Sequence, residues 1–375
     1  MNPLFHTLYF EATRNCNLNC QYCSTKSNVK EKYIDVETDK IIERVLKPAW
    51  DLGTRMIDFS GGEFLLRKDA FTLLKVANDM GFRISIVTNG TLLNQKMIDR
   101  LKDLLGGNLL ISLGVNSFDN KNVETRDCEV DKTLELIDLL EKNGISMNLC
   151  VTIGKFNADS FADTISKIND LKLPYNRTPF TPRNFDCGSL MFDKETMREK
   201  IHPSLLKYYR GYVSYVPFFL TEEDYVKHSG QSHKDSKVPT SPSVGCWVGS
   251  FYGINAEGDV APCPLLLDNV SGGNVYEQNL KDILFESDLF QNIVDRKQLK
   301  GKCGNCKYTY TCGGCRVMAY YQTGDVMAED PTCFMADLSE KELQEMEKQT
   351  YKNFKNYYRM TNFGGVFKKP DATED

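Results

Sequence analysis

Three cysteines near the start of the chain have the residue type and spacing of metal ligands. Cys16, Cys20 and Cys23 follow the pattern Cys-x3-Cys-x2-Cys, directly after a short apolar run. A loop of this length can place three thiolates around one corner of an iron–sulfur cubane and leave the fourth iron without a protein ligand. Clusters that only transfer electrons are usually closed by four thiolates, so an open iron indicates a place to bind a substrate or a cofactor. A structural zinc site is the alternative interpretation, although zinc usually takes four nitrogen or sulfur ligands.

A second set of seven cysteines occupies the last third of the chain: Cys246, Cys263, Cys303, Cys306, Cys312, Cys315 and Cys333. Four of them form two Cys-x2-Cys pairs, a spacing that suits zinc as well as iron–sulfur clusters. The whole chain has 13 cysteines, which is an odd number and a high one. In a reducing compartment this pattern indicates metal binding or catalysis rather than disulfides.

The composition limits the classes of function. The chain has 375 residues, a hydrophobic content of 41% and a net charge of −5. This length suits two or three domains, and the charge does not suit non-specific binding to nucleic acid, which needs clustered lysine and arginine. The first residues lack the basic-then-apolar order of a signal peptide, and no apolar run approaches a membrane span. We therefore expect a cytoplasmic protein that binds neither nucleic acid nor membrane.

The elements that must position the first cysteines alternate between short apolar strands and amphipathic helices. Repeated βα units predict a parallel sheet with right-handed crossovers, and six units rather than eight predict an open, partial TIM-like barrel. Sites in such folds lie at the carboxyl ends of the strands, which is where the three cysteines fall. The predicted strands are Leu8–Ala12, Met56–Phe59, Arg83–Thr88, Asn108–Val115, Ser146–Ile153 and Tyr175–Pro179. The predicted helices are Glu37–Asp51, Arg67–Met80, Asn94–Leu105, Asp131–Asn143 and Asp159–Leu171.

The remaining chain divides by composition. A further predicted helix, Lys194–Tyr212, contains Pro203, at which it could break. Residues 226–245 are polar and rich in serine and proline, which indicates a linker or mobile loop. We expect the partial barrel in residues 1–225, a cysteine-rich domain in 246–335, and a C-terminal helix and tail in 336–375.

The three N-terminal cysteines, with Gly61-Gly62-Glu63 after the second predicted strand, resemble the motifs of the radical S-adenosylmethionine (SAM) superfamily. In that family the open iron chelates the methionine amine and carboxylate of SAM, and one electron cleaves SAM to a 5′-deoxyadenosyl radical. Paired glycines let the backbone approach a ligand closely and present unshielded amide groups. The resemblance implies that Gly61, Gly62 and Glu63 hold the methionine amino group.

The resemblance also implies roles for residues near the other strand ends. Tyr22, between the second and third cysteines, would lie beside the adenine, although a tyrosine that packs the loop is an equal alternative. Asn89, in a Thr-Asn-Gly turn, would shape the floor of the pocket or would only form a tight turn. Ser112 keeps the position of a polar SAM ligand.

After the fourth predicted strand the chain departs from the family pattern. Gly114 stands where relatives often carry aspartate, and Asn116 or Ser117 could substitute for it. Arg126 stands where relatives place an arginine for the SAM carboxylate, and a solvated surface arginine is the alternative.

The second set of cysteines, with a predicted hairpin at Tyr252–Cys263, resembles the SPASM extension of peptide- and protein-modifying radical SAM enzymes. Relatives usually place three residues between the last two closely spaced cysteines, whereas this chain has only Gly313 and Gly314 there. Family pairing implies one [4Fe–4S] cluster on Cys303, Cys306, Cys312 and Cys333. It implies a second on Cys246, Cys263 and Cys315.

The second auxiliary site is one ligand short. Cys187 is the candidate for its fourth ligand; otherwise the site is open. Cys150 alternates with Leu149 and Val151 on a predicted strand, so we expect it to be buried core. With the first site, three [4Fe–4S] clusters and SAM are the expected cofactors, and two zinc sites are the alternative for the second set of cysteines.

The resemblance implies abstraction of a hydrogen atom, with the protein selecting which substrate hydrogen lies near the radical. Our preferred hypothesis is a maturase of a ribosomal peptide or protein. Because the cluster motif begins at residue 16, we expect a peptide substrate to need a separate leader-binding protein or a different docking surface. We expect a flavodoxin or ferredoxin as electron donor. One alternative is oxidation, epimerisation or decarboxylation of a small metabolite of the aminocyclitol or tetrapyrrole type; another is a non-catalytic electron-transfer or zinc scaffold.

Two further features bear on the substrate. Pro264 follows Cys263, where sulfatase-maturating relatives carry a catalytic aspartate, so formylglycine formation is disfavoured unless Asp268 or another group substitutes. Arg177 and Arg183 near the expected barrel mouth could pair with substrate carboxylates, and packing at the strand end is the equal alternative.

Overall fold

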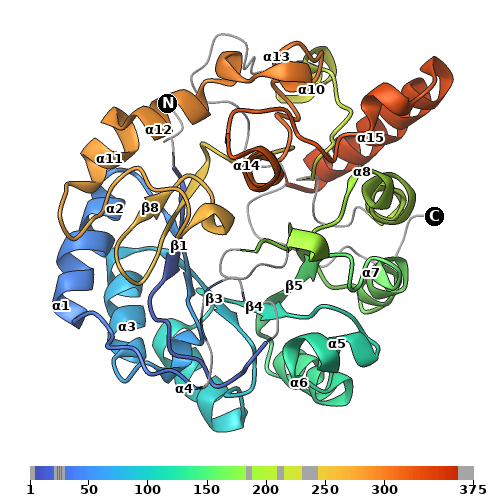
Figure 1. Cartoon of the computed structure of the whole chain (residues 1–375). Helices are drawn as coiled ribbons and strands as arrows, with labels where there is room; N and C mark the ends of the chain where they lie inside the picture. Colours follow the sequence, from blue (N-terminus) through green and yellow to red (C-terminus); the bar gives the residue numbers. More distant parts are fainter. Residues whose placement is uncertain are drawn as a thin grey trace.

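One eight-stranded sheet runs through both cysteine-containing parts of the chain (Figure 1). The computed structural model describes residues 5–20, 23, 25, 27, 30–182, 188–208, 215–229 and 244–361. Tyr22, Arg183, Cys187, residues 230–243 of the predicted linker and the tail from residue 362 lie outside this part. The strands are β1 Thr7–Glu11, β2 Met56–Ser60, β3 Arg83–Thr88, β4 Leu109–Gly114, β5 Ser146–Ile153, β6 Tyr175–Pro179, β7 Phe251–Ile254 and β8 Val260–Ala261.

The strand order is β6-β5-β4-β3-β2-β1-β7-β8. All neighbours from β6 to β7 pair in parallel, and only β7 and β8 pair antiparallel. The six parallel strands in chain order confirm the predicted partial barrel. The sheet does not end at β1, however, because Thr7 to Phe10 pair with Phe251 to Ile254 of the C-terminal part.

Side chains of β5 alternate between a buried outer face and an inner face that keeps some solvent access. In β5, Met147, Leu149 and Val151 are buried in the core between sheet and helices. Asn148 and Cys150 between them are half-buried and face the barrel interior. The expectation that Cys150 is core is therefore wrong, because its strand neighbours take the outer face. On the other strands, several inner-face residues are buried as well: Glu11, Ser60, Ser85 and Ser112.

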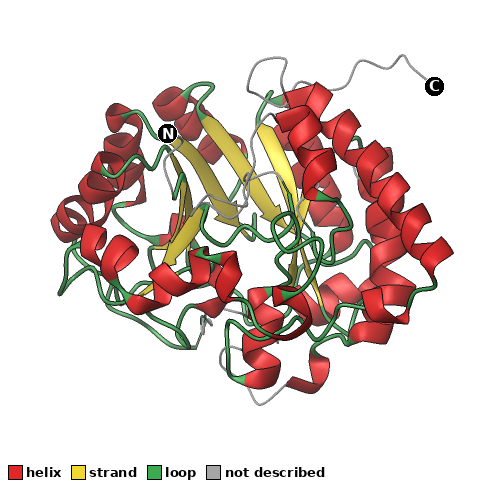
Figure 2. Ribbon diagram, turned by 90° about the horizontal axis from the view of Figure 1, so that it is seen from above, coloured by secondary structure: helices red, strands yellow, loops and turns green. Residues whose placement is uncertain are grey.

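Helices lie on the outer side of the curved sheet (Figure 2). Helix starts and stops follow local chemistry: Asn94 caps one helix by accepting the Met97 N–H at 3.0 Å, and Gly81 ends another with φ of 98°. The barrel elements are α1 Thr38–Ile41, η1 Ile42–Leu46, α2 Lys47–Asp51, η2 Phe64–Leu66, α3 Ala70–Met80, α4 Gln95–Leu105, α5 Asn120–Arg126, α6 Val130–Lys142, α7 Phe161–Asp170, η3 Gly188–Leu190, α8 Lys194–Thr196, η4 Met197–Ile201, α9 His202–Lys207 and α10 Glu222–Ser229. The C-terminal elements are η5 Pro264–Leu266, α11 Leu280–Glu286, α12 Asp288–Val294, η6 Arg296–Gln298, α13 Gly301–Gly304, α14 Arg316–Thr323, η7 Met335–Asp337 and α15 Glu340–Thr361.

Two boundaries differ from the sequence-based expectation. The chain stays helical at Pro203 but changes helix type just before it, since η4 ends at Ile201 and α9 begins at His202; Pro203 then lies in the first turn of α9, where a missing N–H is tolerated. The run passes through η4 and ends at Lys207 rather than Tyr212. The first four residues of the predicted linker, 226–229, belong to helix α10 instead.

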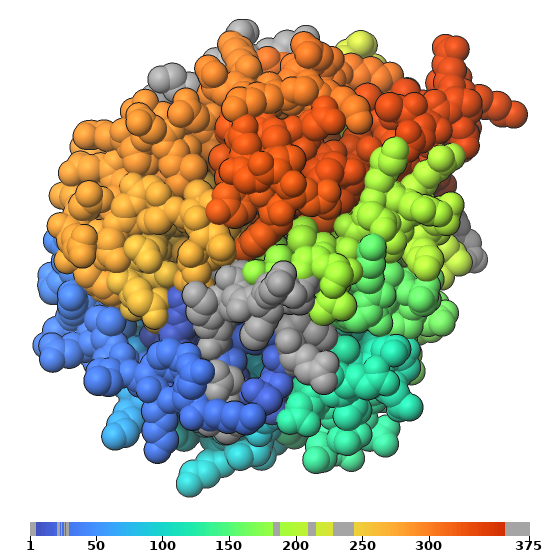
Figure 3. Space-filling view, in the orientation of Figure 1, coloured from blue at the N-terminus to red at the C-terminus, as the bar shows by residue number. Residues whose placement is uncertain are grey.

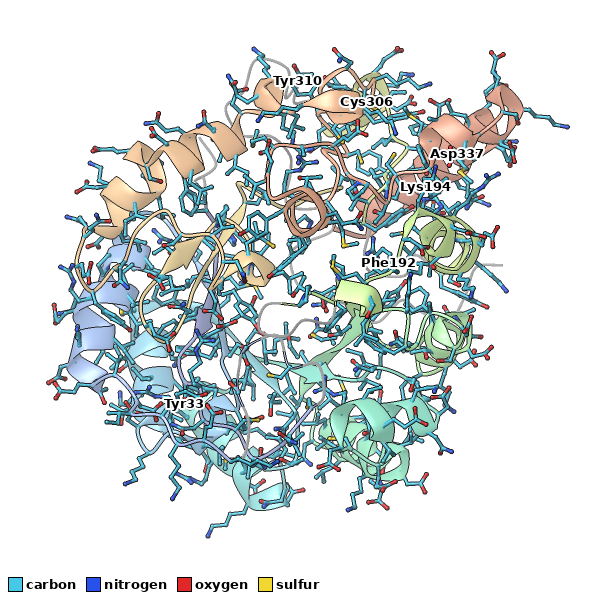
Figure 4. All side chains as sticks on the ribbon, viewed as in Figure 1. Tyr33, Phe192, Lys194, Cys306, Tyr310 and Asp337 are labelled. Atoms are coloured by element: carbon cyan, nitrogen blue, oxygen red, sulfur yellow. The ribbon has the colours of Figure 1, made fainter. Side chains whose placement is uncertain are left out.

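The C-terminal part packs along one side of the barrel (Figure 3, orange and red). The ion pair between Lys194 of α8 and Asp337 of η7, 2.6 Å long, joins the two parts at one end (Figure 4). The turn of the β7–β8 hairpin contains Gly258 with φ of 98°, as the predicted hairpin requires. Among the described residues, no helix combines the length and the apolar composition needed to cross a membrane.

Candidate functional site

The three N-terminal cysteines lie in the loop that leaves β1, and all three are half-buried and free of disulfides. The Leu18 N–H points at the sulfur of Cys16 at 3.5 Å, and the Thr25 N–H points at the sulfur of Cys23 at 3.4 Å. Burial, and to a smaller degree the neighbouring thiols Cys23 and Cys16, raise the pKa of Cys20 to about 11, against the lowering effect of Arg126. Backbone N–H donors and a nearby guanidinium favour thiolates, so the loop fits an iron–sulfur cluster.

Gly61 and Gly62 lie directly against this loop. A Cβ at Gly61 would be 2.3 Å from the carbonyl oxygen of Thr13, and a Cβ at Gly62 would be 2.3 Å from that of Asn15. The N–H of Gly62 donates to Thr13 and that of Glu63 donates to Asn15, both at 2.8 Å. The amide groups expected to face a ligand are thus used to fasten the cysteine loop, which leaves carbonyl oxygens as the acceptors of this turn.

Replacing Gly62 by alanine should lower the free energy of unfolding by about 1–3 kcal/mol, because overpacking forces the backbone apart. The methyl group would meet backbone atoms of Asn15 and Arg14 that cannot rotate away. Urea unfolding without oxygen measures the change. Gly107→Ala is the matched control, since no atom lies within 4 Å of the added carbon. Equal stability of the two variants would contradict the close approach.

The Glu63 side chain forms hydrogen bonds within the protein and does not face the solvent. The carboxylate is fully buried. It accepts hydrogen bonds from the Thr88 hydroxyl at 2.9 Å and the Asn89 N–H at 2.9 Å. Burial raises its pKa, and these hydrogen bonds oppose that effect. Glu63 therefore ties the end of β2 to the end of β3.

Asn89 continues this connection toward the cysteines. Its side-chain amide donates to Asn17 at 2.9 Å and points at the sulfur of Cys16 at 4.0 Å, while its oxygen accepts from Thr91. Ser112 lies deeper, on the inner face of β4, where its hydroxyl donates to Asn148 at 2.6 Å. The structure thus brings Asn89 to the cysteine loop and places Ser112 inside the barrel.

Gly114 explains how Arg126 reaches the same area. A Cβ at Gly114 would be 2.2 Å from the guanidinium of Arg126, so an aspartate at this position would collide with it. The Arg126 Nε is buried without a hydrogen-bond partner. Asn116 and Ser117, the proposed substitutes, are buried and donate local hydrogen bonds, Asn116 to Thr125 and Ser117 to Asp119 just before α5. Of these residues, only Arg126 has a donor group still without a partner.

The C-terminal cysteines fall into two groups. One cavity is lined by Cys303, Cys306, Cys312 and Cys333, and by none of the other three. Backbone N–H groups of Asp330, Tyr308 and Phe218 point at the sulfurs of Cys303, Cys306 and Cys312 at 3.3–3.4 Å. Cys246, Cys263 and Cys315 lie in or against a second apolar cluster, which Cys303 of the first group also contacts. In the described part of the chain, no three histidine, cysteine, aspartate or glutamate side chains converge tightly enough to hold a single metal ion.

Buried guanidinium groups surround the C-terminal thiols. A Cβ at Gly313 would be 2.0 Å from Arg296, and a Cβ at Gly314 would be 2.7 Å from Arg316. The Nη2 of Arg316 lies 3.7 Å from the sulfur of Cys303, and Arg296 donates to the carbonyl oxygen of Cys246 at 2.7 Å. The two glycines that form the unusually short spacing therefore make room for two positive charges.

Arg177 lies near the C-terminal thiols with its Nε buried, so it does not line an open barrel mouth. It donates to the carbonyl oxygen of Val216 at 3.2 Å, and burial lowers its pKa while the nearby Cys315 raises it. The alternative of strand-end packing therefore describes Arg177 better than a contact with substrate carboxylates.

Arg14 links the two parts of the site. It is buried, and its guanidinium lies 2.5 Å from Asp268, 2.6 Å from Glu257 of the hairpin turn and 3.4 Å from Glu11. It also donates to the carbonyl oxygen of Thr25 in the cysteine loop at 2.7 Å. Asp268, suggested as a base in place of Pro264, is thus already paired with a cation.

The barrel interior contains a polar chain that the sequence analysis did not single out. Asp58 of β2 is hydrogen-bonded to Ser85 of β3. The Ser85 hydroxyl lies 3.0 Å from that of Ser112, which continues to Asn148. In the sequence, this polar chain is indicated by Asp58, an aspartate in the middle of a mostly apolar strand.

Asp58 should make stability depend on pH. Burial raises its pKa to about 6, against the lowering effect of Ser85, whereas the unfolded value is about 3.9. The folded state therefore holds this proton more tightly, and the stability contributed below both pKa values is lost as pH rises through 6. Between about pH 5 and about pH 8, the wild type should lose about 1 kcal/mol relative to Asp58→Asn in urea unfolding. Parallel pH profiles would contradict this, and Asp103→Asn on the exposed face of α4 is the control.

Comparisons with known proteins agree with this architecture. The family model of the radical SAM superfamily matches residues 10–168, and that of SPASM, an iron–sulfur cluster-binding domain, matches residues 246–307. The AdoMet-dependent heme synthase of Methanosarcina barkeri is 27% identical over 342 residues, which cover 86% of this chain and 95% of the relative. The PqqA peptide cyclase of Granulibacter bethesdensis is 25% identical over 349 residues, covering 88% and 87%.

Solved structures show the same fold. Streptococcus suis SuiB bound to its precursor peptide SuiA superposes with a TM-score of 0.62 at 17% identity, covering 88% of this chain and 75% of SuiB. The two matched domains imply [4Fe–4S] clusters and binding of SAM. This chain belongs to the radical SAM superfamily and carries a C-terminal SPASM iron–sulfur cluster-binding domain.

Proposed function

We propose that this enzyme cleaves SAM reductively at Cys16, Cys20 and Cys23 and abstracts a hydrogen atom from a ribosomal peptide or protein. The observation that carries the choice of substrate is the inner wall of the barrel. From the second residue of each strand β1 to β6 onward, the inner-face positions carry hydroxyl, amide, carboxyl, thiol and apolar side chains but no lysine, arginine or histidine, and one guanidinium, that of Arg126, lies against this face at Gly114. Peptide groups can bond to such a wall, whereas a tetrapyrrole with several carboxylates would need cations there.

The residues around the cysteine loop divide the task of holding SAM. The carbonyl oxygens of Gly61 and Gly62 would accept hydrogen bonds from the methionine ammonium, because the N–H groups of Gly62 and Glu63 are already used to fasten the loop. Arg126, whose Nε has no partner, would pair with the methionine carboxylate. Glu63 and Asn89 would hold the Gly61–Gly62 turn and the cysteine loop in fixed positions relative to each other. Bound SAM supplies the 5′-deoxyadenosyl radical, and the protein decides which hydrogen lies beside it.

The C-terminal thiols would hold two auxiliary [4Fe–4S] clusters. One would be bound by the four cysteines that line the cavity, and the other by Cys246, Cys263 and Cys315, with Cys187 as the candidate fourth ligand. Arg296 and Arg316 would balance the negative charge of clusters removed from water. A flavodoxin or ferredoxin would supply the electron, and a separate protein would present the leader of the peptide.

A small metabolite is the second candidate substrate. It is favoured by one finding, the slightly higher identity to AdoMet-dependent heme synthases than to PqqA peptide cyclases. The enzyme would use the same cysteines and the same SAM turn, so only the substrate distinguishes the two candidates.

Mass spectrometry of products tests the proposal. The reconstituted enzyme, with SAM and dithionite, is incubated with candidate precursor peptides and, separately, with tetrapyrrole carboxylates and aminocyclitols. A mass change on a peptide together with 5′-deoxyadenosine supports the proposal, and product from a small molecule alone overturns it. Iron should approach about twelve atoms per chain, as three cubanes require; about four, or stoichiometric zinc, would overturn the auxiliary clusters.

A further inference from the structure

Asp330 contacts both groups of C-terminal cysteines. It is buried, and it lines the same cavity as the four cysteines of the first group. Its backbone N–H points at the sulfur of Cys303 at 3.4 Å, whereas its carboxylate accepts the N–H of Cys315 at 2.6 Å. Cys303 belongs to the first proposed auxiliary cluster and Cys315 to the second. One residue therefore reaches from the ligands of one cluster to those of the other.

The turn that contains Asp330 fixes the direction of its carboxylate. One oxygen accepts hydrogen bonds from the N–H of Thr332 at 2.9 Å and from the Thr332 hydroxyl at 2.7 Å. An aspartate that accepts from the backbone two residues further on is a common turn former. The hydrogen bond from Cys315 to the other oxygen is not part of such a turn. It holds the carboxylate against the second group of cysteines.

Gly314 allows this close approach. A Cβ at Gly314 would be 2.8 Å from the sulfur of Cys303 and 2.9 Å from the Cβ of Asp330. It would also be 2.7 Å from the guanidinium of Arg316. A thiol, a carboxylate and a guanidinium thus converge on the residue directly before Cys315, and a side chain there would force them apart.

The charge of Asp330 acts on thiols of both groups. Burial raises the pKa of Cys315 to about 12, and the Asp330 carboxylate is the next cause of that rise. Burial also raises the pKa of Cys303; the Asp330 carboxylate adds to this rise and the Arg316 guanidinium opposes it. Burial lowers the pKa of Arg177, while Cys315 and Asp330 raise it, so a cation lies near the second group as well. Asp330 is the carboxylate that acts on thiols of both groups.

We propose that the carboxylate of Asp330 opposes reduction of both auxiliary clusters and so sets their reduction potentials together. This inference rests on the proposed function only for the presence of the two clusters. Net charge and hydrogen bonds near the sulfurs set the potential of an iron–sulfur cluster. A fixed negative charge disfavours the addition of an electron nearby. Asp330 acts through the cysteine ligands and is in this sense a positioning residue.

Redox titration followed by electron paramagnetic resonance, without oxygen, tests the inference. The background is the full chain with its three N-terminal cysteines replaced by alanine, so that the signals come from the C-terminal clusters. There, Asp330→Asn should favour one-electron reduction of each cluster at least about tenfold, an upward shift of about 59 mV. The backbone N–H toward Cys303 survives the substitution. Asp330→Ser, whose hydroxyl can still form the turn, should shift both potentials in the same direction.

Two controls separate the charge from the local structure. Asp325 also accepts the N–H two residues further on, at 2.8 Å, but it pairs with Lys300 at the surface. Because exposed charges are screened, Asp325→Asn should change the reduction equilibria less than about twofold. Thr332→Val removes one hydroxyl donor and keeps the charge of Asp330, so neither potential should rise. Iron near eight atoms per chain, about two cubanes, shows that a variant has both clusters bound.

The outcomes distinguish this inference from the proposed function. A rise of both potentials in the two Asp330 variants, and in neither control, supports it. A rise at one cluster only, unchanged potentials with both clusters bound, an equal rise in Thr332→Val, or loss of iron from both Asp330 variants overturns it and leaves the auxiliary clusters in place. A background chain that holds little iron before Asp330 is changed overturns the auxiliary clusters, and the inference with them.

Discussion

Cys16, Cys20 and Cys23 replaced together by alanine should give a protein that no longer cleaves SAM. The rate of 5′-deoxyadenosine formation should fall at least about 1,000-fold, which corresponds to more than 4 kcal/mol of activation free energy. The reason is that the three thiols form one group at the end of β1, with backbone N–H groups aimed at two of the sulfurs. Chromatography of 5′-deoxyadenosine, with dithionite as reductant, measures the loss.

The same triple variant should keep its C-terminal clusters. The cavity of Cys303, Cys306, Cys312 and Cys333 shares no lining residue with the N-terminal loop, so about two thirds of the iron should remain. Cys128→Ala is the matched control, because Cys128 is a free, half-buried cysteine that belongs to neither set. SAM cleavage that persists in the triple variant, or that disappears in Cys128→Ala, would refute the assignment.

Replacing Arg14 by methionine should destabilise the protein by about 3–5 kcal/mol, the range found when one partner of a buried ion pair is removed. The variant would leave Asp268 buried without its cation, since the side chains of Arg14 and Asp268 are only 5% and 6% exposed. Urea unfolding without oxygen measures the loss, and the slope with urea shows whether unfolding remains cooperative.

Two further variants test the explanation. Lys75→Gln removes an exposed ion pair of the same length, 2.5 Å to Asp79, and should cost less than about 1 kcal/mol. Asp268→Asn in the Arg14→Met background should recover part of the stability, because the buried charge of Asp268 is then removed while that of Glu11 remains. If Arg14→Met lowers the free energy of unfolding no more than Lys75→Gln does, water must reach the charges around Arg14, and the explanation is wrong.

Much of the barrel could be predicted because its information is local. The predicted bounds of β3, β5 and β6 are the observed ones. In β5 the signal is the alternation of Leu149 and Val151 with polar residues, and the ends of neighbouring helices are marked by glycines and an asparagine. The cysteine loop and the turn at Gly61 follow from short motifs. These features depend on residues within one element or one turn.

The features that escaped prediction depend on pairs of residues far apart in the chain. The pairing of β7 with β1 leaves no periodic pattern in either segment, because β7 has only four residues. Nothing near Arg14 shows that its partners are Glu257 and Asp268, and nothing near Gly114 shows that Arg126 needs its space. Such contacts are set by tertiary packing, and local propensity carries no information about them.

The pairing of β1 with β7 also sets an order for assembly during synthesis. The ribosome makes about 240 further residues between these two strands, which takes roughly 12–50 s at about 5–20 residues per second. Throughout that interval the edge of β1 is open to other strands, a known route to aggregation. Arg14 meanwhile has neither Glu257 nor Asp268 to hold it. The first cysteines to leave the ribosome are therefore among the last to reach their finished surroundings, and metal loading should follow release of the chain rather than accompany its growth.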